Sequence, residues 1–233
     1  MKIADMTWMQ VEEYLERDDR CVLPLGSIEQ HAYVSLATDS ILAERVALEA
    51  AEPLRIPVFP VQSYGVSPYF MAYPGTVTLS AATYERVVEE ILASVGRHGF
   101  RRIVVVNGHG GNSPARRVAE AWADGVSGVE LRWHDWWRAP RVRAAVEAID
   151  PDASHASWME TFPWTRVEGV EPPDDHKVPV TLTDRAELSP SRFRERLEDG
   201  SFGGDYTRSD EETAGLWEVA VQEVRQRLTE GWS

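Results

Sequence analysis

The feature that most constrains the fold is a regular alternation of short apolar runs with stretches of helical periodicity. Each run is bounded by turn residues or a polar cluster, which is typical of a strand buried inside a sheet. The predicted strands are Cys21 to Leu25, Val58 to Val61, Ile103 to Val106 and Val129 to Trp133. Because strands that alternate with helices favour a parallel sheet, we predict an α/β fold. It is a single three-layer domain over residues 1–233, with a mainly parallel central sheet and helices on both faces.

Residues that cap helix N-termini predict where the helices begin. Thr7 with Gln10 forms a capping box, and Thr38, Ser80 and Ser113 stand where three more helices should start. In the second half of the chain, 140–209 reads as irregular and polar, apart from a charged helix face within 187–199. A terminal helix is predicted over 210–228, with its inward residues at Ala214, Trp217, Val221, Val224 and Leu228.

Composition excludes several classes of partner. The chain has 24 Lys and Arg residues against 38 Asp and Glu residues, and its net charge of −14 repels phosphate backbones and anionic membrane surfaces. The single cysteine, Cys21, cannot form an internal disulfide, which suits a reducing compartment. We expect no signal peptide, and no apolar run approaches the roughly 18 residues needed to span a bilayer. The expectation is a cytoplasmic protein that binds a small molecule and neither nucleic acid nor a membrane.

Candidate metal ligands lie where two of the predicted strands end. Glu29 and His31 follow the first strand and are two residues apart, so on an extended chain they point to the same side, and Asp39 comes at the start of the next helix. His109 follows the strand at 103–106, among glycines that let a side chain approach an ion closely. Imidazole together with carboxylate suits Zn²⁺, Mn²⁺ or Fe²⁺. The sequence therefore predicts a metal centre at this edge of the sheet.

Each of these residues also has a simpler interpretation. A single His or Asp is more often a hydrogen-bonded or solvated group, and the tryptophans after residue 132 more often pack in a core or a subunit interface. Position favours a site, because two strand ends of one sheet each present such groups. A non-catalytic metal- or ligand-binding protein stays the alternative of another class, since it would use the same ligands without an open coordination position.

Five motifs in order along the chain resemble those of the creatininase (creatinine amidohydrolase) family. The glycine-rich loop around His109 alone would be weak, but the order of all five makes the match specific. The motifs are Leu23–His31, Thr38-Asp39, Tyr73–Thr76, Asn107–Asn112, and His155-Ala156 with Glu160-Thr161.

The resemblance implies a creatininase-like fold and a centre of two divalent ions. Asp39 would bridge both ions, Glu29 and His109 would hold one, and His31 with Glu160 would hold the other. His155 matches the family's catalytic histidine and would carry protons beside Glu160, while water activated by the metal ions attacks the substrate. The family also implies a homo-oligomer, commonly a hexamer.

Two departures from the family pattern concern the substrate. In creatininase itself a glutamate two residues past the loop histidine is a metal ligand, whereas this chain has Gly111 at that position. The formamidopyrimidine deformylases and the mycofactocin peptidase resemble this chain in using a later glutamate, which corresponds to Glu160. Tyr33 also lies in a segment that differs from many members. These departures argue against creatinine and for another small cyclic amide or related C–N bond. Ring-opening C–C hydrolysis of a cyclic diketone such as 3-dehydro-scyllo-inosose is a close alternative. The candidate substrate contacts are Tyr33, Tyr73, Gly110 and Trp158.

Overall fold

Parallel strands form the centre of the molecule in the computed structural model, which describes residues 1–232. The strands are β1 (Arg20–Leu25), β2 (Arg102–Asn107) and β3 (Glu130–Asp135), in the order β1-β2-β3. In register, Val22 lies beside Val104, and Val106 lies beside His134. The predicted α/β class is confirmed, and all three carboxyl ends lie at the same edge of the sheet.

The run predicted as a strand over 58–61 is not a regular strand. Val58 and Gln62 make isolated parallel bridges to Val22 and Leu25, along the free edge of β1. Proline at positions 57 and 60 explains the difference, because proline has no backbone N–H to donate to a strand ladder. The segment therefore covers the edge of β1 without extending the sheet by a full strand.

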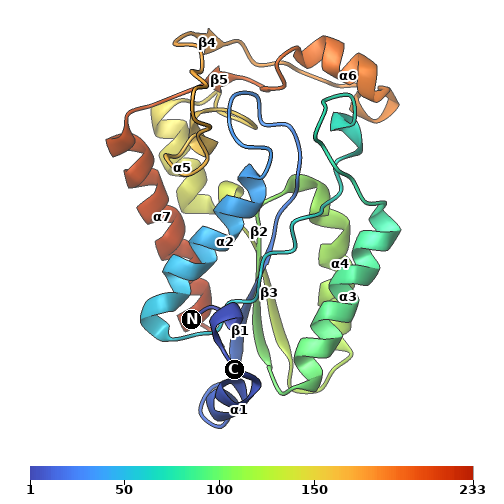
Figure 1. The fold of residues 1–233 in the computed structure, drawn as a ribbon, viewed down its shortest axis with the longest axis vertical. Helices are drawn as coiled ribbons and strands as arrows, with labels where there is room; N and C mark the ends of the chain where they lie inside the picture. The colour runs from blue at the N-terminus through green and yellow to red at the C-terminus, as the bar shows by residue number, and fades with distance from the viewer. Residues whose placement is uncertain (233) are drawn as a thin grey trace.

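Helices cover both faces of the sheet, as predicted (Figure 1). One face carries α2 (Thr38–Ala51), α5 (Pro140–Ile149) and α7 (Asp210–Thr229), and the other carries α3 (Ala81–Arg97) and α4 (Ser113–Asp124). Helix α1 (Trp8–Leu15) lies at the amino ends of the strands and contributes Tyr14 to the core beneath α3 and α4. Side chains alternate along each strand: Val22 and Val104 pack with α2, whereas Leu23 and Val105 pack with α3 and α4. Two apolar cores, one on each side, hold the sheet and its C-terminal edge in place.

The predicted helix caps are correct at two positions and wrong at two. Thr7 forms its capping box, and the Ser80 hydroxyl accepts a hydrogen bond from the Thr83 N–H. Thr38 and Ser113, by contrast, are the first residues of their helices, whose N-caps are Ala37 and Asn112. Their hydroxyls are occupied as donors, Thr38 to the Ser35 carbonyl at 2.6 Å and Ser113 to the Gly110 carbonyl at 2.7 Å. A hydroxyl turned back to the preceding turn does not cap its helix.

The second half of the chain is more regular than its sequence predicts. Helix α5 occupies the start of the segment expected to be irregular, with Pro140 at its first position and Val142 and Val146 buried. The charged stretch forms the short helix α6 (Pro190–Leu197), and β4 (His176–Lys177) pairs antiparallel with β5 (Gly204–Asp205). In α7, Ala214 is exposed, contrary to prediction, and Thr213 and Leu216 are buried instead.

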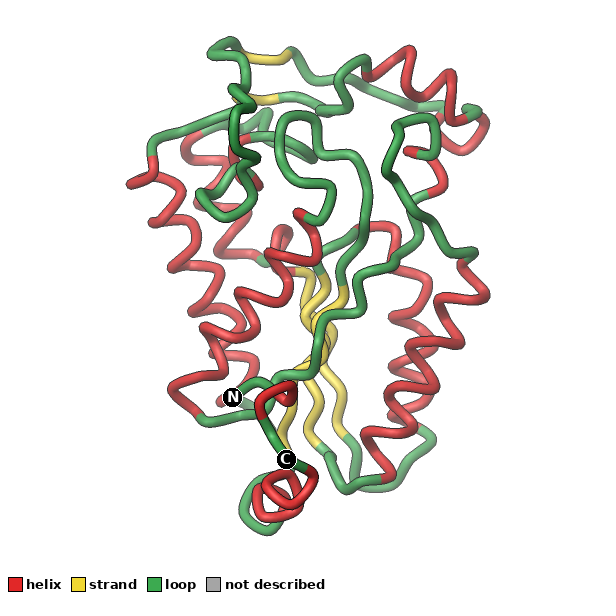
Figure 2. Tube along the Cα trace, in the orientation of Figure 1, coloured by secondary structure: helices red, strands yellow, loops and turns green. Residues whose placement is uncertain are grey.

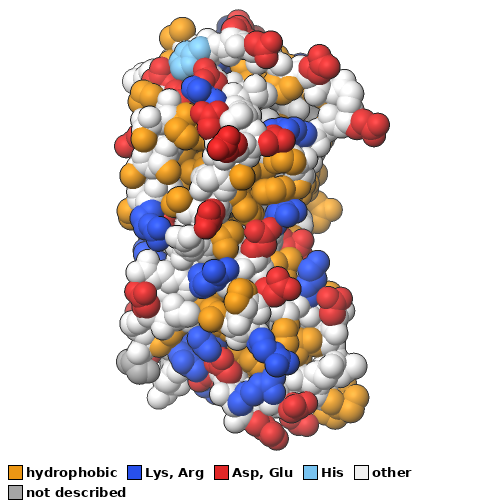
Figure 3. Space-filling model, turned by 90° about the vertical axis from the view of Figure 1, so that its left-hand side faces the viewer, with side chains coloured by type: hydrophobic (Ala, Val, Ile, Leu, Met, Phe, Trp, Pro, Cys, Tyr) orange, Lys and Arg blue, Asp and Glu red, His pale blue; other side chains and the backbone are white. Residues whose placement is uncertain are grey.

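Loops gather above the carboxyl ends of the strands (Figure 2). Several contain single 3₁₀ turns, namely η3 (Pro68–Phe70), η4 (Gly110–Asn112), η5 (Trp136–Arg138), η6 (Trp158–Glu160) and η7 (Arg185–Glu187); η1 (Ile3–Asp5) and η2 (Glu52–Leu54) lie elsewhere. None of the helices within 1–232 is long and apolar enough to cross a membrane. The space-filling view shows acidic, basic and apolar side chains interspersed over one face of the molecule (Figure 3).

Candidate metal centre

The start of α2 is held against the ends of β1 and β2 by close backbone contacts. A Cβ atom on Gly26 would lie 2.4 Å from the Ser40 Cα, and one on Gly108 would lie 2.4 Å from the Asp39 carbonyl oxygen. Only glycine fits at these two positions. The contacts place Asp39, on the first turn of α2, between the side chains that follow the two strands.

Asp39 lies between two histidines, one for each of its carboxylate oxygens. Its Oδ1 is 3.1 Å from His31 Nε2, and its Oδ2 is 2.9 Å from His109 Nδ1. The Ser27 hydroxyl donates a hydrogen bond of 2.8 Å to Oδ2. Asp39 therefore belongs to two groups whose ligand atoms all lie within 4.8 Å of one another: Glu29, Asp39 and His109 form one group, and His31, Asp39 and Glu160 form the other.

The two glutamates complete these groups from opposite directions. Glu29 Oε1 is 3.3 Å from His109 Nδ1, while Glu160 Oε2 is 3.9 Å from His31 Nε2 and accepts a 2.7 Å hydrogen bond from the Ala156 N–H. The second oxygen of Glu29, Oε2, is buried and accepts no hydrogen bond from the residues that the structure describes. A buried carboxylate oxygen without a partner is costly, and a cation would satisfy it. The residues present thus fit divalent metal ions.

Both histidines are held so that one ring nitrogen faces the carboxylates. The Nδ1 of His31 lies 3.2 Å from the Glu29 carbonyl, and the Nε2 of His109 lies 3.0 Å from the Val66 carbonyl. A carbonyl oxygen only accepts, so in the neutral imidazole each of these nitrogens carries the hydrogen. The other nitrogen then presents its lone pair to Asp39, which is the arrangement of metal-binding histidines.

The pKa values of the buried histidines and of Glu160 show that this centre favours bound positive charge. Burial by itself would lower the pKa of His31, but the carboxylates of Asp39 and Glu160 outweigh it and raise that pKa to about 10. The pKa of His109 is raised as well, against the effect of burial, by Glu29 and Asp39. Burial also raises the pKa of the Glu160 carboxyl to about 7. Protons on the histidines therefore balance carboxylate charge that metal ions would otherwise balance.

His155 lies next to these residues, between aromatic rings. Its ring stacks on Phe70, with centroids 5.0 Å apart, and meets the edge of Phe202 at 5.5 Å. The Nδ1 atom is 3.8 Å from Glu29 Oε1, and the Nε2 atom is 2.9 Å from the Gln30 side-chain amide nitrogen. Burial lowers the pKa of His155 to about 4, so its ring is neutral near pH 7.

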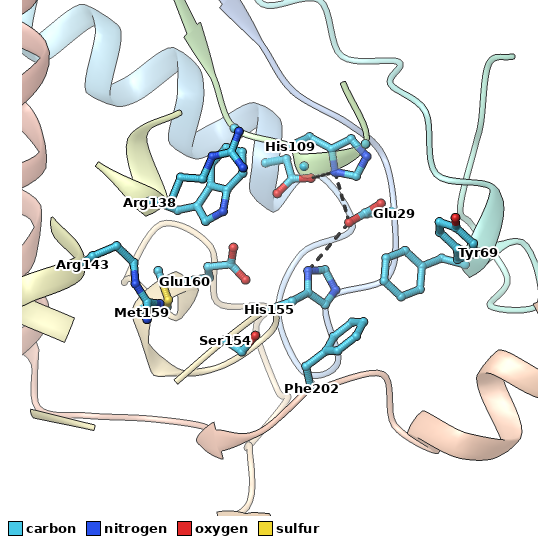
Figure 4. A pocket seen from close by; sticks show the side chains of 16 residues that line it. Glu29, Tyr69, His109, Arg138, Arg143, Ser154, His155, Met159, Glu160 and Phe202 are labelled. Carbon is cyan, nitrogen blue, oxygen red and sulfur yellow. Dashed lines mark ion pairs between the residues drawn. The ribbon is translucent and has the colours of Figure 1, made fainter. Parts of the chain in front are cut away.

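A cavity of about 660 Å³ opens beside the metal-ligand candidates. Figure 4 shows Glu160 and His155 at its centre, Arg138, Arg143 and Met159 on one side, and Tyr69 on the other. We did not predict either arginine from the sequence. Arg138 could have been found, because it follows the end of β3, the third strand at the same edge of the sheet.

Of the four candidate substrate contacts, the structure brings only Gly110 to the wall of this cavity. Tyr33 packs against the Tyr206 ring, and Tyr73 is buried beside Phe70. Trp158 is fully buried in the core, because the turn η6 directs Met159 and Glu160 toward the cavity and Trp158 away from it. These three aromatic residues thus lie outside the lining of this cavity, and Trp137 is the tryptophan that lines it.

The structure also explains why no side chain stands at position 111. A Cβ on Gly111 would lie 1.9 Å from the Val66 carbonyl oxygen and 2.4 Å from His109 Nε2. The same carbonyl accepts the hydrogen bond that orients His109. A glutamate ligand therefore has no room here, and Glu160 lies where it can face His31 instead.

Comparison with known proteins agrees with this geometry. Residues 4–228 match the family described as "Creatininase: Creatinine amidohydrolase". The chain belongs to the creatininase family. Its match covers all five motifs and every candidate ligand, from Glu29 to Glu160.

Relatives within the creatininase family carry different activities in their names. The chain is 34% identical to the creatinine amidohydrolase of Pseudomonas putida over 119 residues, which cover 48% of this chain and 45% of that protein. It is 32% identical to the 3-dehydro-scyllo-inosose hydrolase of Thermotoga maritima over 111 residues, covering 45% and 34%. The chain thus matches less than half the length of these curated relatives. A mutant creatininase described as Zn-Zn type shares the fold, with a TM-score of 0.78, 24% identity and coverage of 98% of this chain and 97% of that one.

Proposed function

We propose that this protein is a metal-dependent hydrolase with two divalent ions at the carboxyl edge of its sheet. Glu29, Asp39 and His109 would hold one ion, and His31, Asp39 and Glu160 would hold the other. The observation that carries the proposal is the position of Asp39, whose two oxygens each face a different histidine at 3.1 and 2.9 Å. Zinc, manganese and iron all suit this mixture of imidazole and carboxylate.

The cavity beside the centre favours an enzyme over a protein that only binds metal. When bound, a pair of divalent ions lowers the pKa of water and polarises a carbonyl group. Space of about 660 Å³ next to the ligands can admit a small molecule. The N–H of Gly110, at the wall of the cavity, is a candidate donor to the oxygen that becomes negatively charged.

His155 is the residue that would carry the proton. In hydrolysis of an amide, the oxygen of water adds to the carbonyl carbon, the C–N bond breaks, and a proton must reach the leaving nitrogen. The neutral His155 ring, 3.8 Å from Glu29 and held by Gln30, can take a proton from the attacking water and deliver it there. Glu160, beside it in the cavity, would assist while it holds a metal ion.

A C–N bond in a small cyclic amide is the favoured target, and a C–C bond in a cyclic diketone is the second candidate. The second candidate is supported by the 32% identity to a 3-dehydro-scyllo-inosose hydrolase. Both reactions begin with the same addition of water to a carbonyl carbon. They differ in the leaving group, which is an amine in one and an enolate carbon in the other.

The setting of the protein is part of the same proposal. We propose that the chain works as one domain, as a homo-oligomer such as the family's hexamer, in a reducing cytoplasm. The buried and unpaired thiol of Cys21 supports the reducing compartment.

Removal and return of metal tests the proposed activity. The protein is stripped with a chelator and reloaded separately with zinc, manganese or iron, and its products from a panel of cyclic amides and cyclic diketones are identified by mass spectrometry. We expect turnover to vanish on stripping and to return with one of these metals. A ring-opened acid that carries a new amino group indicates C–N cleavage, and a ring-opened acid without a new amino group indicates C–C cleavage. Full turnover by metal-free protein would refute the proposal.

A further inference from the structure

Two arginines lie on one side of the cavity, close to the candidate metal ligand Glu160. Arg138 and Arg143 both line the cavity, and Figure 4 shows them on the same side as Met159 and opposite Tyr69. Their side chains are 50% and 37% exposed. Each therefore keeps part of its guanidinium group within reach of a molecule in the cavity.

Arg138 is held in position by a buried hydrogen-bond network. Its Nε and Nη2 atoms donate to Asp135 Oδ2 at 2.8 and 2.5 Å. The other oxygen of Asp135 accepts hydrogen bonds from Asn107 and Trp133, both at 2.8 Å. Asn107 also donates to the His109 carbonyl, so the network connects the Arg138 guanidinium to the loop that carries a candidate metal ligand.

The remaining donors of both arginines are available to a ligand. Nη1 of Arg138 makes no hydrogen bond to any of the residues 1–232 that the structure describes. Arg143, on α5, donates from Nη2 to Glu147 at 2.6 Å, one helical turn away. An exposed pair of this kind contributes little to stability, so Arg143 can exchange Glu147 for another anion at small cost.

The charge around the cavity is unusual for this chain. The protein has a net charge of −14, yet the cavity wall contains two arginines besides the three carboxylates proposed to bind metal. With two divalent ions bound, four positive charges would face three negative ones before the arginines are counted. Arg138 and Arg143 are paired with Asp135 and Glu147, but both line the cavity and present donors there that a neutral substrate would leave unused.

We propose that Arg138 and Arg143 bind an anionic oxygen group of the substrate while the metal centre holds its carbonyl. Guanidinium groups bind carboxylate and phosphate through paired hydrogen bonds, which suits this role better than lysine would. The substrate would therefore carry a carboxylate or phosphate group in addition to the carbonyl group that is attacked. This inference rests on the proposed function, because it assigns the substrate class of the same site.

Binding of hydroxamates tests the inference without a turnover assay. Zinc-loaded protein is titrated calorimetrically with the monohydroxamates of succinic, glutaric and adipic acid, with their neutral methyl esters, and with phosphonate analogues. The hydroxamate group binds zinc, and the tail reaches toward the arginines. We expect at least one acid to bind about tenfold more tightly than its ester, as for a charge-assisted hydrogen bond. Tighter binding of the carboxylate or of the phosphonate tells which anion the natural substrate carries.

Two variants and a matched control identify the groups responsible. The side chain of Arg143 is partly exposed, so the Arg143→Gln protein should fold normally. Arg138→Lys keeps the positive charge but loses the paired donors of the guanidinium group. Each variant should lose most of the preference for the acid over its ester. Arg116→Gln, which breaks the equivalent exposed pair with Glu120 on α4, should leave it unchanged. Zinc content is measured separately and tests the metal centre. Wild-type protein that holds zinc but binds acid and ester equally would overturn the inference, as would a preference that survives both arginine variants.

Discussion

Charged side chains are paired at the amino end of the central sheet but not fully paired at its carboxyl end. At the amino end, Arg20 and Arg102 lie side by side on β1 and β2, and Asp18 and Asp19 pair with them at 2.5 to 3.1 Å. At the carboxyl end, carboxylates outnumber the groups that could balance them, and Glu29 Oε2 has no partner among the described residues. The charges at the amino end balance one another, whereas the carboxylates at the carboxyl end need bound cations to balance their charge.

This difference separates ion pairs that stabilise the fold from charges kept for function. The charges at the amino end are partly exposed, so little is lost by taking them out of water. Those at the carboxyl end are buried, and burying charge without full compensation costs stability. Such a cost is expected at a site that binds a ligand. Substitutions at the carboxyl end should therefore affect metal binding, and those at the amino end should affect only stability.

The largest effect should come from Asp39, because both proposed ions depend on it. Asp39→Asn keeps the shape of the side chain but removes its charge, so we expect metal content to fall from about two ions per chain to less than one, with turnover below detection. Metal content is measured by mass spectrometry of the purified protein. Glu49→Gln, on the same helix, is the control and should keep both ions. An Asp39→Asn protein that still binds about two metal ions and turns over substrate would contradict the claim that the carboxyl end needs cations.

Gly111→Ala should disrupt the metal centre at the carboxyl end through a steric clash, without any change of charge. Its Cβ would meet the Val66 carbonyl oxygen at 1.9 Å and push it from His109, so we expect a loss of about 3 kcal/mol in unfolding free energy and weaker metal binding. Denaturant unfolding with and without zinc measures both effects. Gly110→Ala is the matched control, because its nearest neighbour, the Trp137 ring, is 3.9 Å away. Equal unfolding free energies of the two variants would contradict this prediction, because the loop would then accommodate a Cβ at position 111 at little cost.

His134 shows that a buried ionisable group at the carboxyl end need not bind a cation. Burial, with a smaller contribution from Arg227, lowers its pKa to about 4, below the unfolded value of 6.5. The unfolded chain therefore binds the proton more strongly below pH 6.5, and stability falls as the pH falls. Relative to His134→Gln, the wild type should lose about 2 kcal/mol more between pH 7 and pH 5. Parallel pH profiles of unfolding for the two proteins would contradict this assignment.

The smallest effect is expected at the amino end. Asp18→Asn weakens the hydrogen bonds to Arg20 and Arg102 and should lower the unfolding free energy by about 1 kcal/mol. Metal affinity should not change, since no candidate ligand is involved. Thermal unfolding and zinc titration check the two statements. A change in zinc affinity would mean that the ends of the sheet are coupled.

The sequence predicts best what depends on local pattern. Alternation of apolar runs with helical stretches identifies the buried strands, and the meeting of parallel strand ends at one edge of the sheet predicts that Glu29, Asp39 and His109 lie together. Glu160 and His155 are predicted only by the family resemblance, because they lie in an irregular segment with no periodicity to place them. Trp158 shows the limit of sequence proximity: closeness to Glu160 along the chain does not tell which way a side chain points in a 3₁₀ turn.

Other features depend on contacts that local pattern does not encode. The helix α5 follows the Trp-rich end of β3 and has only Val142, Val146 and its first proline as signals. The place of Arg138 after β3 can be predicted from the sequence, but its orientation depends on Asp135, which Asn107 holds by a further hydrogen bond. The Gly111 restriction depends on Val66, which approaches from a loop far earlier in the chain.

Anomalous X-ray diffraction at the zinc edge from zinc-soaked crystals tests the central claim most directly. We expect two peaks that share Asp39 as a ligand, each about 2.0–2.3 Å from its oxygen and nitrogen ligands. One peak should contact Glu29 and His109, and the other His31 and Glu160. Absence of a peak at Asp39, or zinc bound only at the separate group of Asp150, Asp152 and His176, would contradict the proposal.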